Sequence, residues 1–150
     1  MADAWALLAY RLPREPSTPR IALWRRLRRL GALQLSDGLV ALPENERTRE
    51  QLEWLADEVL EAGGDATVWI ATPSTRAQGR ALVERMTENT SAEYRKLAAE
   101  AQSLASRKQT VARLRRTLGA IRARDYFSSP ERACAERAVE ALASKVEAAA

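Results

Sequence analysis

The chain has 150 residues, 46% hydrophobic and 29% charged, which suits one small domain or a small domain with an extension. It contains no histidine and a single cysteine, Cys134, which excludes His-dependent triads, His-ligated zinc and an internal disulfide, and indicates a reducing cytoplasm. No apolar run is long enough to span a membrane, and the start of the chain lacks the pattern of a signal peptide.

The 24 basic and 20 acidic residues are grouped in blocks along the chain. Residues 11–29 hold seven Arg and one acid, residues 44–65 hold eight acids and two Arg, and residues 107–124 hold seven bases and no acid. Of the basic residues, 21 are Arg. Arginine suits phosphate and carboxylate binding, although a GC-rich genome would give the same bias.

The first elements are a strand and a helix. The apolar run at residues 5–10, followed by prolines, predicts a buried strand. Thr18 as N-cap and Pro19 in the first turn predict a helix start, and Gly31 predicts its end. Apolar residues recur at helical spacing between these signals.

A hairpin, a second helix and a last strand follow. Asp37-Gly38 between apolar runs predicts the hairpin turn, and residues 48–51 match a capping box that opens an acidic helix. Gly63-Gly64 ends this helix, and residues 66–72 are rich in β-forming residues. The order over residues 1–73 is that of an α+β, ferredoxin-like βαββαβ domain.

Residues 74–150 carry almost only helical patterns and predict a helical extension that packs on the first domain. A short helix is expected from Ser74 to about Thr87, and apolar residues from Tyr94 to Ile121 predict one long helix. A turn at residues 125–130 then leads into a last helix, so that the extension forms a long helical hairpin.

Two basic segments are candidates for binding nucleic acid. On the helix at residues 20–29, an Arg cluster beside the helix start would bind phosphates, unless it pairs with the acidic helix at residues 46–61. On the long helix, bases spaced by seven would follow a DNA backbone, unless they form an ordinary solvated face. The candidate nucleic-acid residues are Arg20, Arg25, Arg28, Arg29, Lys108, Arg115, Arg116 and Arg122.

Other residues give weaker signals. Arg11, Arg14 and Arg20, with Arg25 nearby, are candidates for an oxyanion site. Cys134 is expected to be a small buried residue, and Tyr126-Phe127 to fill a helical corner. No metal site or catalytic motif is found, and no enzymatic activity is expected.

Several sequence words resemble one known family. Residues 8–20 (LAYRLPREPSTPR) and 23–32 (LWRRLRRLGA) resemble the N-terminal domain of the chromate resistance regulator ChrB family. The resemblance continues through residues 37–43, 48–55, 63–69, 93–95 and 122–127. Residues 23–32 are also weakly similar to the ferredoxin-like domain of PaaX-type repressors.

The resemblance implies a bacterial regulator of a chromate-efflux operon, with promoter DNA as partner and chromate as signal. Family members commonly carry a second, C-terminal module, which would be a further partner here. The resemblance therefore favours a non-enzymatic, DNA-associated module. A protein-interaction or homodimerisation module and an oxyanion sensor, for chromate or sulfate and without DNA binding, remain the alternatives.

Overall fold

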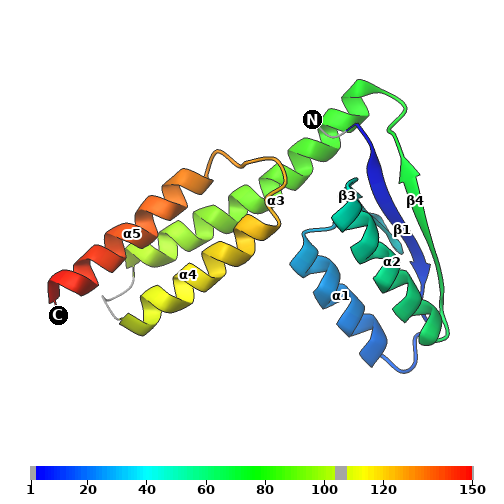
Figure 1. Cartoon of the computed structure of the whole chain (residues 1–150), viewed down its shortest axis with the longest axis horizontal. Helices are drawn as coiled ribbons and strands as arrows, with labels where there is room; N and C mark the ends of the chain where they lie inside the picture. Colours follow the sequence, from blue (N-terminus) through cyan, green and yellow to red (C-terminus); the bar gives the residue numbers. More distant parts are fainter. Residues whose placement is uncertain (1–2, 104–107, 150) are drawn as a thin grey trace. The chain divides into compact units, whose positions relative to one another are not determined.

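A computed structural model describes residues 3–103 and 108–149 (Figure 1). The chain divides into two compact units, Met1–Arg85 and Met86–Ala150, and each is described by itself. Its elements are β1 (Trp5–Arg11), α1 (Thr18–Leu30), β2 (Leu33–Ser36), β3 (Leu39–Pro43), α2 (Glu46–Glu61), β4 (Asp65–Ala71), α3 (Arg76–Ser103), α4 (Lys108–Ala123) and α5 (Arg132–Ala149).

The first unit contains a four-stranded antiparallel sheet with the strand order β2-β3-β1-β4. β1 lies in the middle, with Leu8 opposite Val40 of β3 and Val68 of β4. This element order and sheet order confirm the predicted α+β, ferredoxin-like fold. The predicted domain boundary at residues 73 and 74 follows β4, whereas the compact units divide within α3.

The core of the first unit lies between the sheet and the helix pair α1 and α2, which cover one face of the sheet (Figure 1). Ala6, Leu8 and Leu42 of the sheet are fully buried, and each helix contributes an apolar stripe. Burying these side chains is the main favourable contribution to folding of this unit. The stripes consist of Leu23 and Leu27 on α1, and of Leu52, Leu55, Ala56 and Val59 on α2.

Helix caps and turn glycines set the element boundaries, and the structure corrects two of the predicted N-cap residues. The N-cap of α1 is Ser17, not Thr18, and the helix ends at Gly31 in the left-handed conformation. The capping box of α2 pairs Asn45 with Thr48, so Thr48 is its third helical residue and not its N-cap. At the hairpin, Gly38 has a φ of 74°, and a Cβ there would collide with the backbone of β1.

The second unit is formed by the C-terminal part of α3 together with α4 and α5, not by a two-helix hairpin. The predicted long helix from Tyr94 to Ile121 is divided between α3, which ends at Ser103, and α4, which begins at Lys108. Arg113 contacts Glu100 at 2.7 Å, although the two would lie about 20 Å apart on one continuous helix. Apolar residues of all three helices share one core, so the chain folds back after α3.

The turn between α4 and α5 is held by a polar network. The Tyr94 hydroxyl donates a hydrogen bond to Asp125 (2.9 Å), and the Asp125 carboxylate accepts one from the backbone N–H of Ser129. Burial and the Asp125 carboxylate raise the pKa of Tyr94 above its usual value. Tyr126 and Phe127 lie half-buried in this turn. Among the described residues, no helix combines the length and hydropathy that crossing a membrane requires.

Candidate oxyanion pocket and basic helix surface

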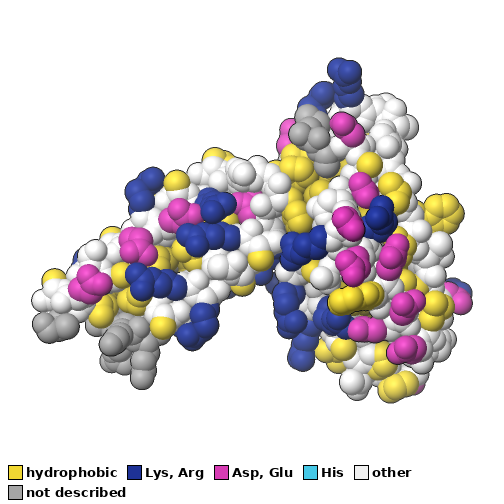
Figure 2. Space-filling model, viewed as in Figure 1, with side chains coloured by type: hydrophobic (Ala, Val, Ile, Leu, Met, Phe, Trp, Pro, Cys, Tyr) yellow, Lys and Arg dark blue, Asp and Glu magenta, His cyan; other side chains and the backbone are white. Residues whose placement is uncertain are grey.

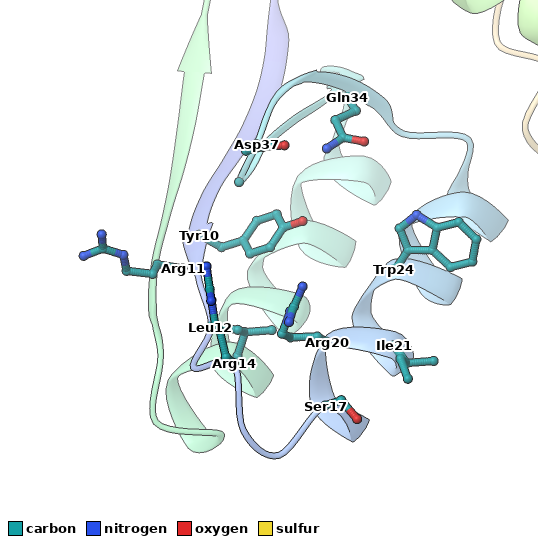
Figure 3. A pocket seen from close by; sticks show the side chains of 11 residues that line it. Tyr10, Arg11, Leu12, Arg14, Ser17, Arg20, Ile21, Trp24, Gln34 and Asp37 are labelled. Atoms are coloured by element: carbon teal, nitrogen blue, oxygen red, sulfur yellow. The ribbon is translucent and has the colours of Figure 1, made fainter.

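A cavity of about 730 Å³ opens in the first unit between the end of β1, the start of α1 and the β2–β3 hairpin. It brings together side chains from three separate stretches of the sequence (Figure 3). The chain enters α1 with Ser17 at its N-cap, so the partial positive charge of the helix start lies beside the cavity. The lining residues are Tyr10, Arg11, Leu12, Arg14, Ser17, Arg20, Ile21, Trp24, Gln34, Asp37 and Gly38.

Two of the three predicted oxyanion residues, Arg14 and Arg20, contribute side chains that suit this cavity. Arg20 extends from α1 toward Tyr10, whereas the side chain of Arg11 points away from them (Figure 3). Burial raises the pKa of Tyr10, and the Arg20 guanidinium partly opposes that rise. Tyr10 therefore keeps its proton at neutral pH and can donate it in a hydrogen bond to an anion.

The α1 arginines lie on an exposed surface that is only sparsely neutralised. Arg26 forms an ion pair with Glu58 of the acidic helix α2. Arg28 lies over the Trp24 ring, 4.7 Å from its centroid. Within residues 3–103 and 108–149, no carboxylate forms an ion pair with the predicted DNA-contacting arginines of α1, which are Arg20, Arg25, Arg28 and Arg29.

The predicted pairing of α1 with the acidic helix is therefore limited to one ion pair in the described part of the chain. Figure 2 shows the acidic side chains of α2 spread over its outer surface, where they face solvent. Exposed ion pairs contribute about 0–1 kcal/mol each, so the Arg26–Glu58 pair attaches α1 to α2 only weakly.

The second basic block has a different electrostatic environment. Arg115 pairs with Glu140 (3.2 Å) and Arg122 with Glu136 (3.2 Å), both on α5. Arg116 is exposed and has no ion pair with a described residue. The side chain of Lys108 lies outside the described residues. Two of the candidate phosphate contacts on α4 are thus already bound to carboxylates of their own unit.

Tyr10 and Trp24 are among the pocket residues that the sequence alone did not identify. Tyr10 and Trp24 were assigned to the apolar patterns of a strand and a helix, but Tyr10 is half-buried and Trp24 is 52% exposed. The available signal was the position of Trp24 among arginines on α1. Cys134, expected to be buried, is exposed on α5 because it lies off that helix's apolar stripe.

Among the described residues, no group of three or more His, Cys, Asp or Glu side chains is placed to hold a metal ion. The pocket offers guanidinium groups, a phenol and one carboxylate, Asp37. Guanidinium and phenol groups are donors suited to oxyanions, whereas cation sites need several oxygen ligands.

Comparison with known proteins gives the family. A family model described as "Protein ChrB, N-terminal" matches residues 20–107, more than half of the chain. Protein ChrB of Cupriavidus metallidurans is 39% identical over 90 residues, which cover 57% of this chain and 27% of that protein. No solved structure matches. The family match covers most of α1, then α2, α3 and every strand of the sheet except β1. The chain belongs to the ChrB N-terminal family.

Proposed function

We propose that this chain is the DNA-associated module of a chromate-responsive transcription regulator, and that it contacts DNA phosphates through α1. Membership of the ChrB N-terminal family supports the regulatory role. The observation that carries the DNA contact is the exposed α1 surface, whose arginines are largely free of carboxylate partners in the described part of the chain.

The geometry of α1 suits a phosphate backbone. Arg25 and Arg29 are one turn apart on the helix, with a rise of about 6 Å between them. Free guanidiniums can exchange water for phosphate without first breaking an internal ion pair. On α4, by contrast, Arg115 and Arg122 would have to leave Glu140 and Glu136. We therefore place the main contact on α1.

Fluorescence anisotropy with the operon promoter, measured over a salt series, tests this proposal. The double variant Arg25→Gln/Arg29→Gln should bind more weakly and lower the slope of log K against log salt by about one for each phosphate that is no longer neutralised. The matched control is Arg47→Gln, an exposed arginine on the acidic helix α2, which should leave binding unchanged.

Two outcomes would contradict the proposal. Binding to the promoter no tighter than to random DNA of equal length would remove sequence-specific recognition. A double variant with wild-type affinity and salt slope would remove α1 as the contact surface.

The pocket supports a second candidate function, oxyanion sensing. Arg14, Arg20 and the protonated Tyr10 together supply charged and neutral donors around one cavity. With no His in the chain and its one Cys remote in sequence, recognition of chromate would be electrostatic and not redox. Calorimetry with chromate and with sulfate tests this. Arg20→Gln should weaken binding and Arg47→Gln should not, while no heat with either anion would exclude the site.

A further inference from the structure

β4 forms an open edge of the sheet in the first unit. It is the last strand in the order β2-β3-β1-β4, and within the described residues no strand pairs with its outer side. Its register with β1 runs over seven consecutive residue pairs without a bulge. The segment Asp65–Ala71 contains no proline or lysine, the residues that commonly block such an edge. Figure 1 shows β4 along the outer side of β1.

The backbone groups that β4 turns outward follow from hydrogen bonds of β1. The N–H of Tyr10 donates to Gly38 (2.8 Å), and the carbonyl of Ala4 accepts from Glu44 (3.0 Å). The backbone N–H and C=O groups of even-numbered β1 residues therefore point toward β3, and those of odd-numbered residues point toward β4. In β4, the odd-numbered residues pair with β1, so the N–H and C=O groups that point outward belong to Ala66, Val68 and Ile70.

The side chains on this edge are apolar and exposed. Trp69 is 57% exposed on the sheet face that carries Leu7, and Ile70 is 50% exposed on the opposite face. Exposing large apolar side chains of two neighbouring residues to water, one on each face of the sheet, is unfavourable. A strand added to this edge would cover both.

The outward groups are arranged symmetrically about Val68. In an antiparallel pair of two β4 strands centred there, Val68 faces its own copy, and Ala66 faces Ile70 of the second copy. The bulky Trp69 then lies opposite the small Thr67, with the two indoles diagonal neighbours. Asp65 lies opposite Ala71, so no like charges face each other within the strand pair.

We propose that β4 is a homodimerisation edge, on which a second copy of this chain adds antiparallel and in register about Val68. The two four-stranded sheets then form one continuous sheet. This proposal does not depend on DNA or oxyanion binding.

Sedimentation velocity of the full chain, from low to high micromolar concentration and without DNA, tests the proposal. We expect a monomer–dimer equilibrium. Trp69→Lys should weaken it by about tenfold or more, because it removes apolar contact and places two like charges close together. The matched control is Trp54→Lys, since Trp54 is similarly exposed (55%) but belongs to α2 and not to the edge strand.

A backbone variant and a cross-link test the register. Val68→Pro deletes one outward N–H, which an edge strand tolerates, and should also weaken the dimer while circular dichroism stays native. In a Cys134→Ser background, Val68→Cys should form an intermolecular disulfide under oxidation, because facing residues lie about 5.5 Å apart. Leu60→Cys on α2 should not.

Three outcomes would overturn the proposal. They are a monomer at every concentration, a dimer unaffected by both Trp69→Lys and Val68→Pro, and a dimer in which Val68→Cys fails to cross-link. A monomer at every concentration would leave a strand from a different protein as the remaining partner for the β4 edge.

Discussion

At the scale of single residues, the pocket depends on contacts between segments that are far apart in sequence. Tyr10 lies near the end of β1, yet its ring is beside Arg20 of the next helix and the hairpin at Asp37. Its phenol is protonated at neutral pH, as in any tyrosine, and burial raises the pKa further by disfavouring the phenolate. The pocket can therefore be probed through the titration of one side chain.

We expect Arg20→Gln to raise the pKa of Tyr10 further. The Arg20 guanidinium stabilises the phenolate and lowers this pKa, so removing the charge leaves burial less opposed. Carbon-13 NMR of labelled tyrosine would follow the titration. Arg25→Gln, on the same helix but outside the pocket lining, is the control and should shift the pKa less. An equal shift in both variants would contradict the described geometry.

Thr48 is a second residue with a specific role, at the start of α2. It is 2% exposed, donates to the Pro43 carbonyl (2.6 Å) and accepts from the N–H of Asn45 (3.0 Å). We expect Thr48→Ala to lower the free energy of unfolding by about 1–2 kcal/mol, measured by urea denaturation. The exposed Thr72→Ala should change it by less than about 0.5 kcal/mol. Equal effects would show that the capping box contributes little.

At the scale of elements, α1 and α4 differ in their partners and not in their composition. Both are Arg-rich amphipathic helices. α4 packs beside α5, whose Glu136 and Glu140 lie within reach of its arginines, whereas α2 supplies α1 with one carboxylate partner, Glu58. Because these pairs need ionised carboxylates, we expect the stability of the second unit to decrease in acid.

Glu136 should contribute to this acid sensitivity. The hydrogen bond from Arg132, with the Arg122 charge, holds the pKa of Glu136 below its usual value. Its stabilising contribution is therefore complete above the unfolded-state pKa and is lost as the pH falls through the lower folded-state pKa. Urea midpoints should drop less on acidification in Glu136→Gln than in the wild type. Glu147→Gln, an exposed residue on α5, should follow the wild type.

At the scale of the whole molecule, the chain has two cores joined by the continuous helix α3. Leu8 is fully buried in the first and Leu114 in the second. Because side chains of each core contact mainly their own unit, a cavity in one should loosen that unit more than the other.

Hydrogen exchange of Leu8→Ala and Leu114→Ala measures this. Each substitution should cost about 2–5 kcal/mol in its own core. We expect faster exchange in the sheet for Leu8→Ala and in α4 and α5 for Leu114→Ala. The exposed Leu60→Ala is the control. Uniform acceleration over both units in either variant would show that the chain unfolds as a single cooperative unit.

The element types, the α+β order and the family resemblance could all be predicted from the amino-acid sequence, because hydrophobic period, turn glycines and sequence words are local properties. Gly31 and Gly38 mark a helix end and a hairpin that the structure contains. Three features needed the folded chain: the return of the chain after α3, the pairing of Arg115 and Arg122 with carboxylates, and the place of Tyr10 in a pocket. These features depend on which distant segments meet, and no pattern along one segment specifies the partner that neutralises its charge or covers its surface.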